Sequence, residues 1–319
     1  MYNCLMVLGP TACGKTSLAV KLADTLNGEI ISADSRQVYC GLDIGSGKDL
    51  CEFQLKQQDG SIKAVPYHLI DVVSLPKEYS VYDYQQDAYK AISEVFSKNK
   101  MPVIVGGTGM YLDALVRGYD LIQVPTNEKL RLELSGKSIE ELVVVLKEKK
   151  GDLHNSTDIT ERHRLIRAIE IADFSESENA AIQKAKMPPR PNINPFIIGT
   201  TFPRDVLRSN IKKRLRARLK EGMIEEVQKI HDSGIEWNRL ERLGLEYRFV
   251  SEYLQGKISS MDDLFTKLNI AIGQFAKRQE TWFRGMERKG VKIHWIEPGS
   301  LDARFSDAMK IIKENNVSI

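Results

Sequence analysis

The sequence contains one short segment whose residue types and spacing are those of a phosphate-binding loop. It reads Gly9-Pro10-Thr11-Ala12-Cys13-Gly14-Lys15-Thr16 and fits the pattern GxxxxGK[ST]. Glycines allow the backbone to approach phosphate oxygens, and the loop N–H groups and the dipole of the following helix favour an anion. Lys15 is expected to reach the distal phosphate, and the Thr16 hydroxyl is expected to bind Mg²⁺. All eight residues are therefore predicted to contact phosphates.

The loop does not specify a reaction, because a diphosphate serves as a leaving group, an energy source or a handle. ATPases and kinases usually add an apolar strand that ends in a metal-binding Asp. Here the strand 103–105 runs into Gly106-Gly107-Thr108, without a carboxylate, whereas the strand 30–33 ends in Asp34. At the carboxyl edge of a sheet, Asp34 fits a metal ligand, a general base or a helix cap.

The apolar pattern around the loop predicts an α/β fold. Buried strands are expected at 4–8, 29–33, 67–73 and 102–105, and amphipathic helices at 16–26 and 81–99. Strands that alternate with helices form right-handed crossover units. We therefore expect a P-loop nucleoside-triphosphatase-like parallel sheet with helices on both faces. The polar stretch 51–65, with its turn-like Asp59-Gly60, predicts a surface hairpin.

The middle of the chain has another character, and we expect a small all-helical insertion domain at 121–195. Three helices are predicted there, at 127–135, 138–149 and 160–174, before the stiff Pro-rich segment 187–191. The core is expected in two parts, 1–120 and 196–319. Its second part is predicted to contain strands at 196–202 and 291–296, long helices at 204–233 and 261–286, and a terminal helix.

Five motifs carry a resemblance to a known family. They are GPTACGKT (9–16), ISADSRQVYCGLDIGSGK (31–48), HLIDV (68–72), VGGTGMYL (105–112) and AKRQETWFRG (276–285). In content and order they resemble the tRNA dimethylallyltransferases, the isopentenyl-adenosine family. The resemblance implies transfer of a dimethylallyl group from dimethylallyl diphosphate to N6 of the adenine at tRNA position 37, with release of pyrophosphate. It also implies Mg²⁺ as cofactor and the tRNA anticodon stem-loop as partner.

The resemblance also assigns roles to residues. Asp34 matches the catalytic aspartate, and a base would help because an exocyclic adenine amine is a poor nucleophile. Thr108 matches a threonine that hydrogen-bonds near the bridging oxygen of the diphosphate. Arg214 matches an arginine that steadies the departing pyrophosphate, where a fixed guanidinium is most useful. The segment that grips the target nucleotide corresponds to Asp34, Ser35, Arg36 and Gln37.

Three places depart from the family pattern. The family commonly has IGTAKP where this chain has Ile44-Gly-Ser-Gly-Lys48-Asp49, and Asn210 replaces a common arginine. The family segment GY[KR][EQ] corresponds to Gly244-Leu-Glu-Tyr247, which reverses a charge. Because that segment touches tRNA in the family, recognition at this edge is expected to differ.

Basic residues mark the expected RNA surface. The helix that begins at Arg204 carries eight cations and one acid through Lys220, a segment that is either a solvated face or an RNA contact. By resemblance, Arg131, Arg164 and Arg167 are expected to clasp the anticodon loop. Lys277 and Arg278 are close in sequence to Trp282, whose ring either stacks on a base or packs in the core. The residues predicted to bind RNA in these segments are Arg131, Arg164, Arg167, Lys277 and Arg278.

Composition excludes several classes of protein. The 319 residues are 42 % hydrophobic and 28 % charged with a net charge of +3, as expected for a globular chain rather than a disordered or collagen-like one. The four cysteines lie within residues 4–51 without zinc spacing, which favours free thiols. Cys13 is a candidate reactive thiol, and His68 is expected to be a core histidine with a satisfied hydrogen bond. No signal peptide or membrane span is recognised, so a cytoplasmic monomer is expected.

Three other functions stay open from the residues. A prenyl transferase for free adenine nucleotides would need neither the insertion nor the basic clusters. A P-loop kinase or NTPase would need a metal-binding carboxylate, which the Gly-Gly-Thr turn does not offer. A non-catalytic RNA-binding module would tolerate loss of Asp34 and Thr108.

Overall fold

The computed structural model describes residues 2–57, 59–150 and 161–317. It divides them into two compact units, one formed by residues 1–118 with 191–319 and the other by Tyr119–Arg190. The predicted insertion, 121–195, ends five residues later than this second unit, and Pro195 already belongs to a strand of the sheet.

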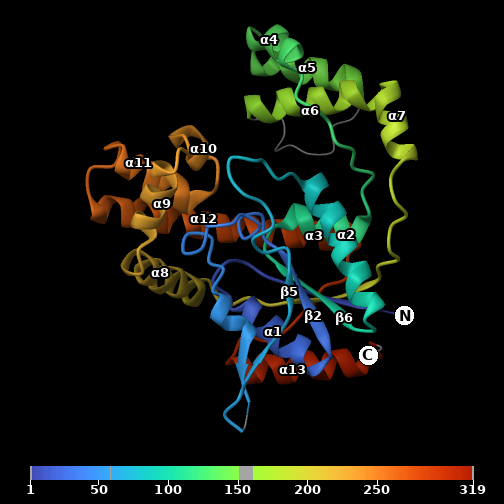
Figure 1. Ribbon diagram of the computed structural model, residues 1–319, viewed down its shortest axis with the longest axis vertical. Helices are drawn as coiled ribbons and strands as arrows, with labels where there is room; N and C mark the ends of the chain where they lie inside the picture. Colours follow the sequence, from blue (N-terminus) through green and yellow to red (C-terminus); the bar gives the residue numbers. More distant parts are fainter. Residues whose placement is uncertain (1, 58, 151–160, 318–319) are drawn as a thin grey trace. The chain divides into compact units, whose positions relative to one another are not determined.

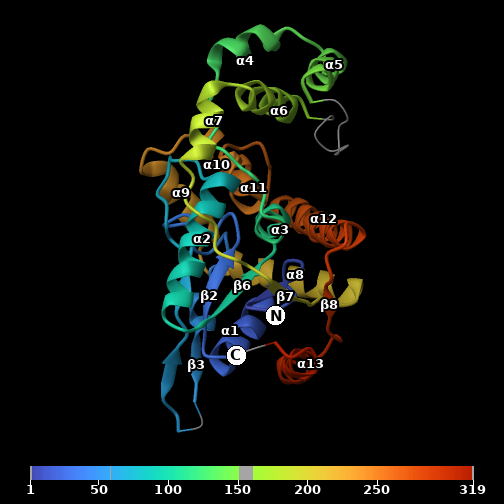
Figure 2. The ribbon, with the colours of Figure 1, turned by 90° about the vertical axis from the view of Figure 1, so that its right-hand side faces the viewer.

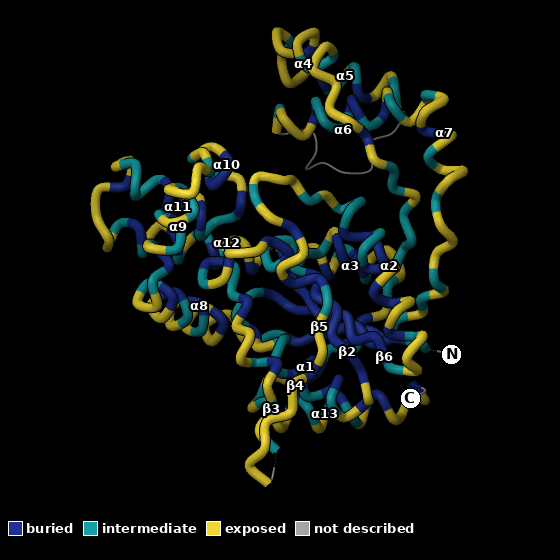
Figure 3. The backbone as a smooth tube through the Cα atoms, in the orientation of Figure 1, coloured by how far each residue is buried: buried dark blue, intermediate teal, exposed yellow. Residues whose placement is uncertain are grey.

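The first unit is built on one parallel six-stranded sheet (Figure 1). Its strand order is β5-β2-β6-β1-β7-β8, and every neighbouring pair is parallel. The strands are β1 (Cys4–Leu8), β2 (Gly28–Ala33), β5 (Tyr67–His68), β6 (Met101–Gly106), β7 (Pro195–Gly199) and β8 (His294–Trp295). Every residue of β1, β2 and β6 is buried, as their continuous apolar runs predict (Figure 3).

Helices cover both faces of the sheet, as expected. Alternate β1 residues Leu5 and Val7 pack with α1 (Lys15–Thr25) and α13 (Leu301–Glu314), which lie on the same side of the sheet (Figure 2). Met6 and Leu8 face the other way, toward α2 (Val81–Ser97) and α3 (Gly109–Arg117). The sheet therefore presents the carboxyl ends of its strands between two helical layers.

A second set of helices packs as a lobe beside the sheet. It comprises α8 (Arg204–Lys220), α9 (Met223–Asp232), α10 (Trp237–Glu241), α11 (Leu245–Leu254) and α12 (Met261–Arg288). Its core also includes Val38, Leu42 and Val73, from the segments that follow β2 and β5. The lobe thus packs directly against the chain that continues from Asp34.

The hairpin predicted at 51–65 is present. The short helix η1 (Leu50–Phe53) leads into antiparallel strands β3 (Gln54–Lys56) and β4 (Ile62–Ala64), which form their own two-stranded sheet and extend away from the main one (Figures 1 and 2).

Every regular element in the described part of the second unit is a helix. The helices are α4 (Glu128–Ser135), α5 (Ile139–Lys150), α6 (Arg162–Ser175) and α7 (Glu178–Ala185), and the first three form a small apolar core. The helix α7 was not predicted, and residue 160, the predicted start of the third helix, lies outside the described residues.

Four predicted elements are wrong in extent. The predicted strand 196–202 is β7, which ends at Gly199. The helix 204–233 is broken, because Gly222 adopts φ +103 between α8 and α9, a conformation that a continuous helix excludes. The strand 67–73 ends at His68, where Leu69 and Asp71 have positive φ values. The last strand covers only His294–Trp295 of the predicted 291–296.

Candidate active site

The predicted phosphate-binding loop joins β1 to α1, the strand-to-helix context that the motif requires. A β-carbon on Gly9 would overlap the carbonyl oxygen of Thr200, so only glycine fits where the loop crosses the end of β7. The Lys15 ammonium donates to the Pro10 carbonyl at 3.3 Å. The loop therefore lies at the carboxyl edge of the sheet, where α/β proteins bind ligands.

Two side chains from distant parts of the sequence hold the loop. Gln279 accepts from the Thr11 N–H and donates to the Gly107 carbonyl, both at 2.8 Å, and so joins the loop to the Gly-Gly-Thr turn. From α13, the buried Arg304 donates to the Cys13 carbonyl at 2.7 Å. Neither residue was predicted as part of the site, although Gln279 lies within the family motif at 276–285.

Asp34 and Thr108 lie on neighbouring strands. Asp34 follows β2, Thr108 follows β6, and the Thr108 N–H donates to the Ala33 carbonyl at 3.2 Å. The Thr108 hydroxyl accepts from the Ser35 N–H at 3.1 Å. Since Gly107 is also bonded to Gln279, contacts run without a gap from the Asp34 segment to the phosphate-binding loop.

The carboxylate of Asp34 shapes a turn rather than capping a helix. Its Oδ1 accepts from the Arg36 N–H at 2.9 Å. Among the described residues, none donates to Oδ2, which leaves one oxygen for a proton from a substrate. The Arg36 side chain lies against Gly244, 3.2 Å from where a β-carbon there would stand.

One face of α8 directs polar and charged side chains toward the loop and the segment that ends at Asp49. Asn210, Arg214 and Arg218 are spaced four residues apart, so they share a face of the helix. Arg214 donates to the Thr11 hydroxyl, Asn210 to the Ala12 carbonyl at 3.4 Å, and Arg218 to Asp49 at 3.2 Å. Burial and the neighbouring Arg218 guanidinium lower the pKa of Arg214 to about 10, which leaves it charged at neutral pH.

A carboxylate faces these cations. The pKa of Glu246 is raised above its usual value, mainly by burial, and the charges of Arg218 and Arg214 offset only part of this rise. The residue that reverses the family's charge therefore lies close to Arg214, Arg218 and Asp34. Arg218 and Glu246 were both missed as site residues, although the four-residue spacing from Arg214 indicates Arg218.

The residues at the loop fit a magnesium ion bound together with phosphates. The Thr16 hydroxyl is partly exposed at the start of α1, and within the described part of the chain it has no hydrogen-bond partner. No group of three His, Cys, Asp or Glu side chains that could hold a metal occurs among the described residues. This suits Mg²⁺, which usually takes few protein ligands and completes its shell with phosphate and water oxygens.

Comparison with known proteins identifies the chain. A model of the IPP transferase family matches residues 37–286, and a model described as isopentenyl transferase matches residues 2–58. The chain belongs to the IPP transferase family. The tRNA dimethylallyltransferase 2 of Treponema denticola is 52 % identical over 297 residues, which are 92 % of this chain and 96 % of that protein.

Solved structures agree with this family membership. The full-length tRNA isopentenylpyrophosphate transferase of Bacillus halodurans is 29 % identical, covers 98 % of this chain and 96 % of its own, and superposes with a TM-score of 0.68. A eukaryotic dimethylallyltransferase acting on tRNA covers 99 % of this chain and 79 % of its own with a TM-score of 0.74. At 20 % identity, this last likeness shows the fold.

In this IPP transferase, the arginines predicted to clasp RNA also build the helical unit. Arg131 and Arg167 both bind the buried Glu170, at 2.7 and 2.9 Å, and Arg167 donates to the Val124 carbonyl. Arg164 pairs with Glu161 at 3.4 Å. Contact of these arginines with RNA stays a prediction, because their positions are already explained by the unit's own packing.

The cations predicted on α12 are exposed. Lys277 and Arg278 both face solvent, with the Arg278 guanidinium 5.9 Å from the ring centre of Phe275. Trp282 is 37 % exposed and lies against Gly109 at the start of α3. Its ring is therefore neither fully buried in the core nor free on all sides.

The structure also tests the predictions for Cys13 and His68. Cys13 is wrong as a reactive thiol, because it is 1 % exposed and burial raises its pKa. His68 has the predicted hydrogen-bond partner, Glu29 at 2.8 Å, but it is not a core residue, because it is partly exposed on the edge strand β5.

Proposed function

We propose that this chain transfers a dimethylallyl group from dimethylallyl diphosphate to N6 of adenosine 37 in tRNA and releases pyrophosphate. One observation carries the proposal beyond family membership. The phosphate-binding loop is bonded to Arg214 and, through Gln279 and the Gly-Gly-Thr turn, to the segment that carries Asp34. Leaving-group chemistry and proton removal thus share one edge of the sheet.

On the donor side, the loop N–H groups and Lys15 bind the diphosphate. Arg214 counters the charge that grows on the bridging oxygen as the carbon–oxygen bond breaks, and it needs no reorganisation because Thr11 already holds it. Thr16 would hold Mg²⁺, which supplies further charge neutralisation on the phosphates when bound.

On the acceptor side, the adenine N6 forms the new bond to the allylic carbon. Its proton passes to Asp34 Oδ2, and pyrophosphate takes the electron pair of the broken carbon–oxygen bond. Thr108, whose hydroxyl already accepts from the Ser35 N–H, donates toward the diphosphate. Ser35, Arg36 and Gln37 hold the nucleotide beside Asp34.

The exposed cations of α8 and α12 support an RNA partner. Six of the eight cations of α8 face solvent, while Arg214 and Arg218 turn inward. A base modified in a stem-loop must leave its stack, and Trp282 offers a surface on which a base can stack. All four cysteines are free thiols, which favours the cytoplasmic location that we propose. A monomeric state is also part of the proposal. No helix in the described ranges has the length and apolarity needed to cross a bilayer.

Label transfer tests the proposal. Purified protein, labelled dimethylallyl diphosphate, Mg²⁺ and an anticodon stem-loop with adenosine at position 37 should give prenylated RNA, and a loop with guanosine at 37 should give none. Asp34→Asn should abolish transfer, whereas Asp59→Asn on the exposed hairpin should not. Transfer to AMP in preference to the stem-loop, or phosphate release from ATP with no transfer at all, would refute it.

A further inference from the structure

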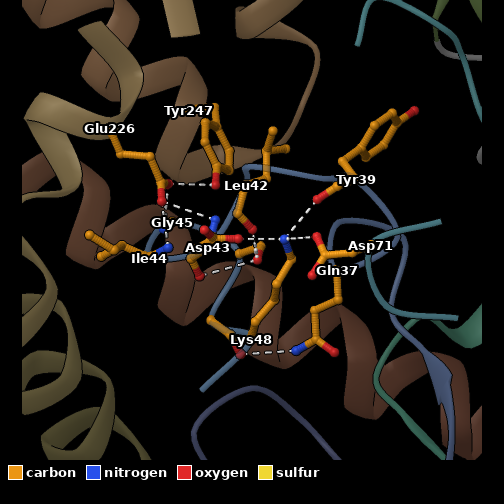
Figure 4. Close-up of polar contacts among 12 residues, drawn as sticks. Gln37, Tyr39, Leu42, Asp43, Ile44, Gly45, Lys48, Asp71, Glu226 and Tyr247 are labelled. Atoms are coloured by element: carbon orange, nitrogen blue, oxygen red, sulfur yellow. Dashed lines mark hydrogen bonds and ion pairs between the residues drawn. The ribbon is translucent and has the colours of Figure 1, made fainter. Parts of the chain in front are cut away.

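The Glu226 carboxylate binds the backbone of the turn formed by residues 43–48. Glu226 of α9 accepts from the N–H groups of Asp43, Ile44 and Gly45, at 3.0, 2.7 and 3.0 Å. Its fourth partner is the Tyr247 hydroxyl of α11, at 2.8 Å (Figure 4). Two donors reach each oxygen, so the carboxylate has a full set of hydrogen bonds.

Tyr247 is built into this contact. It is 1 % exposed, and a β-carbon on Gly45 would stand 2.7 Å from its ring. Burial and the adjacent Glu226 carboxylate raise the pKa of Tyr247 well above its usual range, so its hydroxyl remains a donor. The Tyr247 end of the segment that departs from the family pattern therefore contacts this turn and not solvent.

The buried Lys48 ammonium binds the same turn on its other side. Lys48 is 2 % exposed, and its ammonium donates to the Tyr39 carbonyl at 2.8 Å, to Asp43 at 2.6 Å and to Asp71 (Figure 4). With Glu226 on one side and Lys48 on the other, the turn has little freedom to move.

The turn 43–48 also positions Gln37, which lies near the Asp34 carboxylate. The Gly47 carbonyl accepts from the Gln37 amide at 2.9 Å, and Gln37 accepts from the Ser32 hydroxyl at 3.0 Å. Gln37 lies three residues after Asp34 in the stretch that would hold the acceptor base. Arg218 lies against Gly47 on the other side.

We propose that Glu226 and Tyr247 form a positioning pair for the acceptor side of the site, one that orients the segment 34–37 through the turn 43–48. The proposal rests on the proposed function. The donor side is braced separately, by Gln279 and Arg304. Loss of the pair should therefore slow transfer and weaken stem-loop binding while donor binding is kept.

Substitutions that keep side-chain shape test the pair. In Glu226→Gln, one oxygen becomes an amide nitrogen that cannot accept from a backbone N–H. One or two of the four hydrogen bonds are then lost, depending on which oxygen is replaced, because the Tyr247 hydroxyl can accept from the amide. We expect kcat for stem-loop prenylation to fall about tenfold or more. The calorimetric Kd for a thio-diphosphate analogue of the donor should change by less than about twofold, since its site is braced elsewhere.

Tyr247→Phe removes one hydroxyl and should lower kcat about threefold to tenfold. Because both changes act on one contact, the double variant should be scarcely slower than Glu226→Gln alone. Matched controls are Glu225→Gln, an exposed neighbour on α9, and Tyr253→Phe on α11, which should both behave as wild type.

Three results would overturn the pair. They are wild-type kcat in both variants, an equal loss of donor affinity, and fully multiplicative effects in the double variant. If Glu226→Gln does not fold, Tyr247→Phe and its donor Kd decide the question alone. Failure of the proposed function is distinct, because the wild type itself would then transfer no label to RNA.

Discussion

Gln279 offers the sharpest test of how the site is assembled. Its amide makes two hydrogen bonds of 2.8 Å, one to the Thr11 N–H of the phosphate-binding loop and one to the Gly107 carbonyl. The side chain is 7 % exposed, so water cannot readily replace it. Gln279→Ala removes both bonds, and Gln279→Glu keeps an acceptor for Thr11 but sets a carboxylate oxygen against the Gly107 carbonyl.

The size of the effect follows from the two backbone groups left without partners. Each buried, unsatisfied backbone group costs about 1–3 kcal/mol, so Gln279→Ala should lower the free energy of unfolding by about 2–6 kcal/mol. Because Thr11 also holds Arg214, the loop and the guanidinium should both lose their fixed positions. We expect donor affinity to fall about tenfold, equivalent to about 1.4 kcal/mol.

Urea denaturation and donor titration measure these two effects. Gln274→Ala, an exposed position on the same helix, is the matched control and should change the unfolding free energy by less than about 0.5 kcal/mol. If Gln279→Ala matched this control in both stability and donor affinity, the bridge would have no role in holding the loop, and the reasoning would be refuted.

Three further predictions concern other contacts. Arg304→Ala should lower the melting temperature and weaken donor binding, because the Cys13 carbonyl loses a buried charged donor; unchanged calorimetric values would contradict this. Hydrogen bonds from Arg131 and Arg167 lower the pKa of Glu170 from 4.5 to about 2, so the ionised carboxylate stabilises the fold above pH 4.5 and this stabilisation is lost as the pH falls toward 2. Glu170→Gln should therefore flatten the acid denaturation curve in that window, as measured by circular dichroism. Alkylation at pH 8 followed by mass spectrometry should label the exposed Cys40 and Cys51 and leave Cys13 unmodified until the chain is unfolded.

Local patterns predicted the parts of the structure that depend on local chemistry. The phosphate-binding loop, the hairpin at 51–65 and the alternation of strands and helices each follow from residues close together in sequence. The break at Gly222 was missed because apolar residues continue at helical spacing through Met223 and Val227. A glycine is compatible with either outcome until tertiary packing selects its φ.

The bracing residues could not be read from sequence. Gln279 is separated from Thr11 by 268 residues and Glu226 from Ile44 by 182, so the partners of these side chains are set by the fold and not by local sequence. The resemblance assigned Arg214 to the departing pyrophosphate, and its contact with Thr11 is compatible with that role, which stays a prediction. The ionic network around Arg131 and Arg167 shows that a matched arginine also serves the packing of its own unit.

The hydrogen bond from Arg304 to the Cys13 carbonyl joins two residues that are 291 positions apart, so it cannot form until the end of the chain has been synthesised. At about 5–20 residues per second, a ribosome adds Arg304 roughly 15–60 s after Cys13. During that interval, α1 and the phosphate-binding loop lack the hydrogen bond from Arg304. Competence to capture the prenyl donor is therefore acquired late in translation, and a nascent chain that stalls before α13 is expected to leave its substrate untouched.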